Sequence, residues 1–178
     1  MTSTSDTAIP AVVIMGVAGC GKSEIGNAIS RRVTGSRVIE GDDFHPPENI
    51  KKMSAGTPLN DEDRAGWLAR LGKEVANAVR NGERPILTCS ALKLSYRDTL
   101  RSAVPGLGFV FLDLPKEVAI DRCNHRPGHF MPASLVDSQF ATLERPNGEA
   151  GVLPVDATHS IDELGDQAAD WWKASLPG

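Results

Sequence analysis

The sequence has few aromatic residues, no excess of basic residues and no long apolar run. Phenylalanine, tryptophan and tyrosine make up 5% of its 178 residues. We expect the tryptophan pair at 171–172 to serve core packing or a dimer contact, not base stacking. The formal net charge of -4 gives no reason to expect nucleic acid as a partner. An anionic substrate would have to be attracted by a local basic cluster.

The cysteines are few and widely spaced. Cys20, Cys89 and Cys123 form an odd set in which no disulfide framework can be recognised, as is usual in a reducing compartment. The first apolar run, residues 9–15, is too short for a signal-peptide core and far too short to span a membrane. We therefore expect a cytoplasmic protein with no membrane contact.

Short apolar runs alternate with amphipathic stretches, which favours an α/β fold with a central, mostly parallel, five-stranded sheet flanked by helices. The longest helical pattern has Asn60 or Asp61 available as its N-cap, and Ser160 with Glu163 forms a capping box. With no repeat or linker, we expect a single domain over residues 1–178. The predicted strands are 9–15, 37–40, 85–89, 109–114 and 152–155, and the predicted helices are 21–33, 60–80, 94–104, 116–125, 132–143 and 160–172.

One motif indicates nucleotide binding. Residues 16–23 match G-x-x-x-x-G-K-[ST] in full, after a predicted buried strand and at the start of a predicted helix. A glycine-rich turn that binds nothing is the alternative, but a chance match rarely has both the strand and the helix. Cys20, inside the motif, is either redox-sensitive or simply a small residue that fits there.

Each residue type in this motif has a physical role. Gly16, Gly19 and Gly21 allow backbone N–H groups to turn inward around a phosphate. Lys22 can reach the β- and γ-phosphates of ATP, and Ser23 can ligate Mg²⁺. The predicted ATP site comprises Gly16, Val17, Ala18, Gly19, Cys20, Gly21, Lys22 and Ser23.

The class of phosphate-loop protein follows from what accompanies the motif. The chain lacks the guanine-reading N-K-x-D of GTP-hydrolysing switches. A D-x-x-G match at 162–165 falls within the last predicted helix, so we treat it as chance. The small size favours a metabolite or nucleotide kinase with a P-loop kinase fold.

Five further segments accompany the phosphate loop: G-D-x-x-H-P (41–46), K-M (52–53), P-L-x-D-x-D-R-x-x-W-L (58–68), C-S-A-L-K-x-x-Y-R-D (89–98) and G-H-F-M-P (128–132). Together they resemble the bacterial gluconokinase family, within the shikimate- and adenylate-kinase-like group. The resemblance covers most of the chain and implies ATP- and Mg²⁺-dependent phosphorylation of D-gluconate, and it suggests a homodimer. Another small-metabolite kinase, such as one for shikimate, and a non-catalytic ATP-binding regulator are the alternatives.

Two carboxylates follow the second predicted strand. Asp42 stands where a base for an acceptor hydroxyl should lie, although a turn cap explains it equally well from spacing alone. The resemblance favours substrate contact. Glu40 stands where the related pattern usually has Asp, and the resemblance implies that it helps to hold the Mg²⁺ water shell.

D-Gluconate carries a carboxylate and several hydroxyls, so its site needs cations and polar partners. Salt bridges to acidic neighbours are the alternative for Arg64 and Arg97, and one of the two is expected to be partly structural. Besides Asp42, the predicted substrate contacts are His45, Lys52, Arg64, Lys93, Arg97 and His129.

A basic, turn-rich segment at about 122–133 resembles the lid of this kinase group. Arg122 and Arg126 would then bring guanidinium groups to the phosphates and act in catalysis with Lys22 and Asp42. A solvated basic loop is the bland alternative. A zinc site is a second alternative, because a cysteine and two histidines lie within 123–129. Structural zinc sites usually have four ligands, however, and no fourth is evident nearby.

Overall fold

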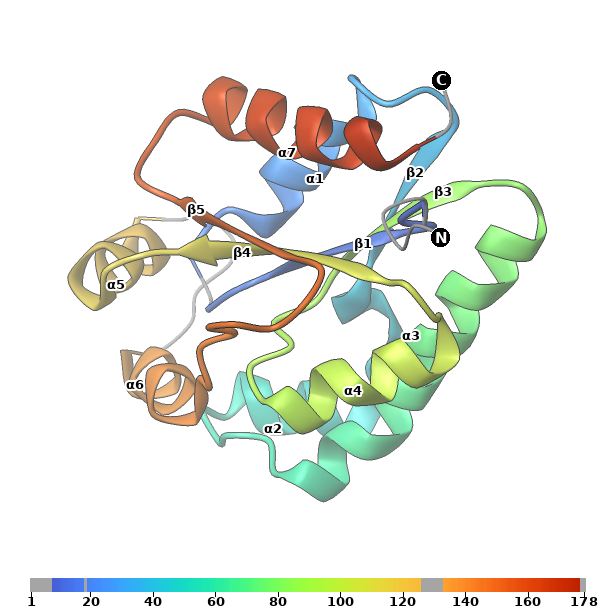
Figure 1. The fold of residues 1–178 in the computed structure, drawn as a ribbon. Helices are drawn as coiled ribbons and strands as arrows, with labels where there is room; N and C mark the ends of the chain where they lie inside the picture. Colours follow the sequence, from blue (N-terminus) through green and yellow to red (C-terminus); the bar gives the residue numbers. More distant parts are fainter. Residues whose placement is uncertain (1–7, 18, 126–132, 177–178) are drawn as a thin grey trace.

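Five parallel strands form one sheet in the order β2-β3-β1-β4-β5 (Figure 1). The structure, a computed structural model, describes residues 8–17, 19–125 and 133–176. Every strand pairing within these residues is parallel, as the alternating pattern predicts. The strands are β1 (Val12–Met15), β2 (Ser36–Glu40), β3 (Arg84–Thr88), β4 (Gly108–Asp113) and β5 (Val152–Asp156).

Helices cover both faces of the sheet (Figure 1). On one face α1 (Lys22–Ser30) packs against α7 (Ile161–Ser175), and on the other α3 (Asp61–Arg80) packs against α4 (Leu94–Ala103). No helix in the described part of the chain is long and apolar enough to cross a membrane. The remaining elements are the 3₁₀ turn η2 (Gly41–Phe44), α2 (Pro47–Ser54), α5 (Lys116–Asn124) and α6 (Ala133–Thr142).

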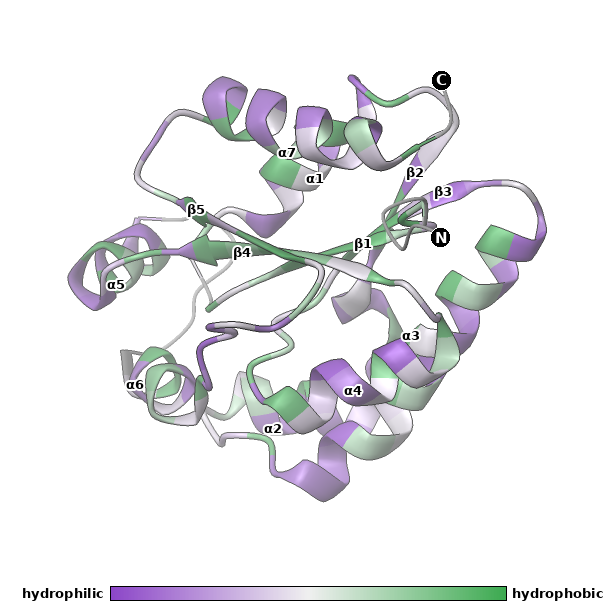
Figure 2. Ribbon diagram, viewed as in Figure 1, coloured by the Kyte–Doolittle hydropathy of each residue, from purple (hydrophilic) through white to green (hydrophobic). Residues whose placement is uncertain are grey.

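The sheet separates two apolar cores. Val12 and Ile14 of β1 pack in the core beneath α1 and α7, while Val13 and Met15 pack in the core beneath α3 and α4. Burial on both faces explains why β1 is continuously apolar. Figure 2 shows the same division, with apolar strands between helices whose outer sides are hydrophilic.

The end of α7 is joined to the residues that precede β1. The fully buried Trp172 donates a hydrogen bond from Nε1 to the carbonyl oxygen of Ile9, at 2.9 Å. The Ile9 N–H donates in turn to Ser175 Oγ at 3.1 Å. Trp172 is therefore a core residue, as one of the two sequence interpretations holds.

The predicted strands and helices are all present, with bounds that differ by a few residues. Asn60 and Ser160 both form the capping boxes that their neighbours predict. Helix α2 was not predicted. Its inward face is polar, because Asn49 is buried while the apolar Ile50 is 49% exposed, so no apolar stripe marks the helix.

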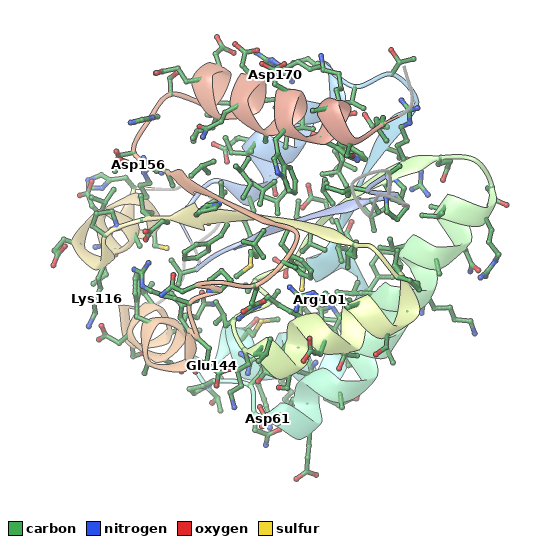
Figure 3. All side chains as sticks on the ribbon, viewed as in Figure 1. Asp61, Arg101, Lys116, Glu144, Asp156 and Asp170 are labelled. Atoms are coloured by element: carbon green, nitrogen blue, oxygen red, sulfur yellow. The ribbon has the colours of Figure 1, made fainter. Side chains whose placement is uncertain are left out.

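Arg97 is a structural residue, which corrects its prediction as a substrate contact. Its side chain is fully buried, and its Nε and Nη2 donate to the two carboxylate oxygens of Glu149 at 2.9 and 2.6 Å. It also donates to the carbonyl oxygens of Ala91 and Glu144. Arg101, labelled with Glu144 in Figure 3, adds a second cation to Glu149 at 2.8 Å. The cluster ties α4 to the segment before β5.

Replacing Glu149 with Gln should lower the free energy of unfolding at pH 7 by about 3 kcal/mol, because the buried Arg97 would lose its counter-charge. The hydrogen bond from Arg97 holds the pKa of Glu149 below its ordinary value. The carboxylate therefore adds stability above its unfolded-state pKa, and this stability is lost as the pH falls through the folded-state pKa. Urea unfolding at several pH values should show the difference between the two proteins shrinking toward acid pH.

Asp98→Asn is the matched control, since Asp98 is the other carboxylate partner of Arg101. The Asp98 side chain is 60% exposed. An exposed pair contributes little, so this change should cost less than about 1 kcal/mol. Equal losses in the two variants would contradict the assignment.

Candidate active site

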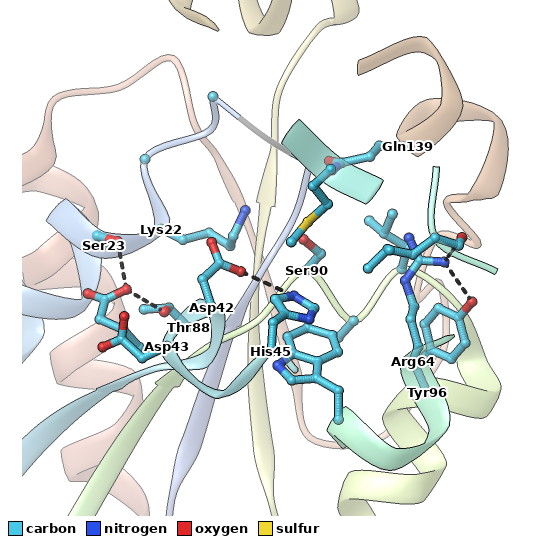
Figure 4. Close-up of a pocket in the computed structure, with 18 of the residues that line it drawn as sticks. Lys22, Ser23, Asp42, Asp43, His45, Arg64, Thr88, Ser90, Tyr96 and Gln139 are labelled. Carbon is cyan, nitrogen blue, oxygen red and sulfur yellow. Dashed lines mark hydrogen bonds and ion pairs between the residues drawn. The ribbon is translucent and has the colours of Figure 1, made fainter. Parts of the chain in front are cut away.

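A cavity of about 560 Å³ opens at the carboxyl ends of β1, β2 and β3 (Figure 4). Parallel strands bring the loops that follow them to one edge, and ligands of α/β proteins bind at that edge. The phosphate loop, η2, the loop after β3, α3 and α4 all contribute lining residues. The volume is in the usual range for a small-molecule site.

The phosphate loop leaves β1 and turns directly into α1. Gly19 has φ +83°, and a Cβ there would lie 2.8 Å from the Ala119 carbonyl oxygen, so the loop requires glycine. Lys22 folds back and donates from Nζ to the carbonyl oxygens of Gly16 and Val17 at 3.1 and 3.2 Å. The N-cap residue of α1, Gly21, has no side chain that could cap the first turn, so N–H groups of this turn can face an anion. Ala18 lies outside the described residues.

Cys20 is packed inside the loop and is 1% exposed. Burial raises the pKa of its thiol above the ordinary value, so the sulfur stays protonated and unreactive at neutral pH. The structure therefore favours the interpretation of Cys20 as a small residue that fits the loop.

Glu40, the last residue of β2, accepts two hydroxyl hydrogen bonds. Ser23 Oγ donates to its Oε1 at 2.9 Å, and Thr88 Oγ1 donates to the same oxygen at 2.8 Å. Ser23 and Glu40 are hard oxygen ligands side by side next to the phosphate loop, and this donor set suits Mg²⁺ held jointly with nucleotide phosphates. Among the described residues, no group of three His, Cys, Asp or Glu could hold a metal alone. Sequence reasoning missed Thr88, although it is the polar end of an apolar run.

The turn η2 places Asp42 and His45 in the cavity. Gly41 allows η2 to approach β3, since a Cβ there would lie 2.3 Å from the Thr88 carbonyl oxygen. The Asp42 side chain is 91% exposed, and its Oδ1 lies 3.7 Å from His45 Nε2. Figure 4 shows Lys22 and Asp42 pointing into the same space. A phosphate held by Lys22 would thus have a carboxylate beside it.

Arg64 lies at the other end of the cavity from the phosphate loop (Figure 4). Its Nη1 donates to the Leu59 carbonyl oxygen at 2.7 Å and to Tyr96 Oη at 3.2 Å. Tyr96 in turn donates to Asp61. Within the described part of the chain the Nε–Nη2 edge of Arg64 has no hydrogen-bond partner, and this edge matches a carboxylate in the two-point manner of guanidinium groups. Tyr96 is a site residue that sequence reasoning missed.

Other predicted substrate contacts lie away from the cavity. Lys52 donates to an Asp63 carboxylate oxygen at 2.8 Å, and Lys93 donates to Asp61 at 2.9 Å. Neither residue lines the cavity, and Arg97 is enclosed in its own cluster. Arg126 and His129 lie outside the described residues. The structure brings together Lys22, Ser23, Glu40, Asp42, His45 and Arg64.

A second cavity, of about 390 Å³, adjoins the opposite side of the phosphate loop. Gly19, Arg122, Ala157 and His159 are among its lining residues. Arg122 donates from Nη2 to the Ala157 carbonyl oxygen at 3.3 Å. Arg122 is therefore next to the phosphate loop, together with the loop after β5.

Comparison with known proteins finds gluconokinases. The chain is 42% identical over 156 residues to the thermosensitive gluconokinase of Escherichia coli (strain K12), covering 87% of this chain and 83% of that protein. It is 46% identical over 144 residues to the gluconokinase of Gluconobacter oxydans (strain 621H), covering 81% and 80%. The crystal structure of a gluconokinase from Sinorhizobium meliloti 1021 matches with a TM-score of 0.84 at 46% identity, covering 94% of each chain. No protein-family model matches.

Replacing Gly19 with Ala should weaken ATP binding by about 10-fold or more, a loss of at least about 1.4 kcal/mol. The added Cβ would meet the Ala119 carbonyl oxygen and Cys123 Sγ, at 2.8 and 3.0 Å, and would displace the loop. Isothermal titration calorimetry with ATP measures the affinity.

Gly35→Ala is the control, because Gly35 has a similar φ of +81° but nothing within 4 Å of its Cβ position. This variant should lose some stability through backbone strain and keep its ATP affinity. Wild-type affinity in Gly19→Ala would show that the loop does not hold the phosphates.

Proposed function

The chain belongs to the gluconokinase family, and on that premise we propose that it transfers the γ-phosphoryl group of ATP to D-gluconate, giving ADP and 6-phospho-D-gluconate. One observation carries the proposal. Along a single cavity, Lys22 of the phosphate loop is followed by Asp42 and then by Arg64 (Figure 4). These are a phosphate-binding group, a base and a carboxylate anchor, in the order that a sugar acid with a terminal hydroxyl requires.

The phosphate end is formed by the loop and by Ser23 and Glu40. On ATP binding, Lys22 exchanges the carbonyl oxygens of Gly16 and Val17 for phosphate oxygens, while the N–H groups at the start of α1 face the same phosphates. Ser23 and Glu40 would hold Mg²⁺ there, and the ion would supply positive charge to the phosphate oxygens. Thr88 keeps the Glu40 carboxylate in place through its hydrogen bond to Oε1.

Asp42 acts at the centre of the cavity. The terminal hydroxyl oxygen of gluconate attacks the γ-phosphorus, and its proton passes to the Asp42 carboxylate. The bond from the γ-phosphorus to the bridging oxygen breaks, and its electrons leave with ADP. Phosphoryl transfer depends mostly on such alignment and on charge compensation. Lys22 and Asp42, which point into the same space, provide the positive charge and the proton acceptor.

Arg64 binds the carboxylate of gluconate through its Nε–Nη2 edge. Its Nη1 is already held by Leu59 and Tyr96, so the guanidinium is oriented before substrate arrives. Lys93 contributes indirectly, through Asp61 and Tyr96. An acid anchored at this end presents its far end to Asp42.

Several remaining assignments follow the family resemblance. Arg122 approaches the phosphates from the nucleotide side, where it already borders the phosphate loop. Arg126 and His129 belong to the same proposed lid at about 122–133, and Lys52 supports the acceptor side through Asp63. We place the protein in the cytoplasm as a homodimer, and the three cysteines, all free and buried, fit a reducing compartment.

A coupled assay of ADP release tests the function. D-Gluconate should support turnover, while shikimate, nucleoside monophosphates and other sugar acids should give much lower kcat/KM values. Turnover with shikimate alone would show that shikimate, and not D-gluconate, is the substrate. No turnover with any of them would leave a non-catalytic ATP-binding regulator.

Asp42→Asn is the control for the chemical step in this assay. The variant should bind ATP with near wild-type affinity and lose transfer by at least about 100-fold, the usual contribution of a positioned base. Loss of ATP binding would instead assign Asp42 to the nucleotide.

Tyr96→Phe should raise the KM for gluconate about 10-fold, because a hydrogen bond that orients a charged group is lost. The ring stays in place, and its contact with the Arg64 guanidinium, 5.4 Å from the ring centre, is retained. Steady-state kinetics should show an unchanged KM for ATP. A parallel rise in both KM values would indicate general damage and would contradict the role of Tyr96.

A further inference from the structure

His45 is held rigidly between the cavity and the protein interior. Its side chain is 3% exposed, and its ring stacks on Trp67 with ring centres 4.0 Å apart and planes 15° apart. Trp67 is itself fixed, because its Nε1 donates to the Gly41 carbonyl oxygen at 2.8 Å. The imidazole therefore keeps its plane, and its two nitrogens face different surroundings.

One of these nitrogens, Nδ1, faces Asn49. The Asn49 side chain is buried, and its Nδ2 donates to the Asp63 carbonyl oxygen at 2.9 Å. A backbone carbonyl can only accept, so this contact establishes which end of the amide carries the hydrogens. The same Nδ2 lies 3.2 Å from His45 Nδ1. Nδ2 therefore donates its second hydrogen to Nδ1, which must be unprotonated.

The other nitrogen, Nε2, faces the cavity. Burial lowers the pKa of His45, with Asp42 acting in the opposite direction and Arg64 in the same direction. The ring is neutral at pH 7 and carries its one proton on Nε2. Nε2 lies 3.7 Å from Asp42 Oδ1, an electrostatic contact that is longer than a hydrogen bond. The Nδ1–H form would instead set two donors against each other in a buried site.

We propose that Asn49 is a positioning residue that holds His45 as the Nε2–H tautomer, so that a polarised N–H faces Oδ1 of Asp42 and Oδ2 is left to receive the hydroxyl proton. The catalytic part of this inference rests on the proposed function. His45 then acts as a donor and not as a second base. The contacts run from the Asp63 carbonyl oxygen through Asn49 and His45 to Asp42. They link α3 and α2 to η2, which carries Asp42.

Nuclear magnetic resonance of protein labelled with ¹⁵N-histidine reports the tautomer directly. The chain has four histidines, and His45→Gln identifies the signals of His45. In the wild-type protein at pH 7 we expect a protonated Nε2 and an unprotonated Nδ1, without averaging between the two forms. A protonated Nδ1, or an averaged pair of signals, would overturn the proposal. The spectrum needs no turnover, so it stands apart from a failure of the proposed function.

Asn49→Leu tests the positioning role in the same spectrum and in kinetics. His45 should become a mixture of tautomers, and kcat with gluconate should fall about 10-fold, a usual effect of losing a supporting hydrogen bond behind a site residue. The KM for ATP should not change. An unchanged tautomer in this variant, or equal losses in kcat and ATP affinity, would overturn the proposal.

Asn77→Leu is the matched control, on the exposed side of α3 and away from the cavity. It should leave the His45 signals and kcat as in the wild type. Thermal unfolding of both variants measures any loss of stability, and the wild-type spectrum decides the tautomer if Asn49→Leu fails to fold.

Discussion

One carboxylate oxygen joins the three segments on which the cavity depends. Glu40 Oε1 accepts from Ser23, at the start of α1, and from Thr88, at the end of β3. The carboxyl ends of β2 and β3 are thereby tied to the phosphate loop. Gly41 follows at once and lets η2 turn tightly over β3, which places Asp42 and His45 beside Lys22. The positions of Asp42 and Lys22 are thus linked through the same local contact.

The distribution of charge explains how a protein with an excess of acidic residues provides a site for anions. Lys52, Lys93 and Arg97 each have a carboxylate partner outside the cavity. Lys22 and Arg64, in contrast, bond to carbonyl and hydroxyl oxygens of the described residues. Within the described part of the chain, these two residues thus have no directly paired carboxylate, and their positive charges lie at the two ends of the cavity. The local basic cluster that an anionic substrate requires therefore consists of residues far apart in the sequence.

Sequence patterns predicted the fold and part of the site well, for identifiable reasons. The phosphate loop, the caps at Asn60 and Ser160 and the strand order along the chain are local features, and the structure confirms them. The prediction that Arg97 contacts the substrate was wrong because its counter-charge, Glu149, lies 52 residues later in the chain, and no local pattern reveals such a pairing. Tyr96 and Thr88 act by holding Arg64 and Glu40, so their roles exist only once distant segments have met. Helix α2 escaped prediction because it buries Asn49 in place of an apolar stripe.

The contact between Trp172 and Ile9 has a consequence for folding during synthesis on the ribosome. The phosphate loop and α1 are made early, yet the core that supports α1 is completed by α7, which follows every strand of the sheet in the chain. Until α7 emerges, α1 is covered by the sheet but not by its partner helix, and Ile9 lacks both of its hydrogen-bond partners. A nascent chain would therefore carry an intact nucleotide motif without the packing that makes it rigid. The core around α1 is therefore complete only when nearly the whole domain has been synthesised.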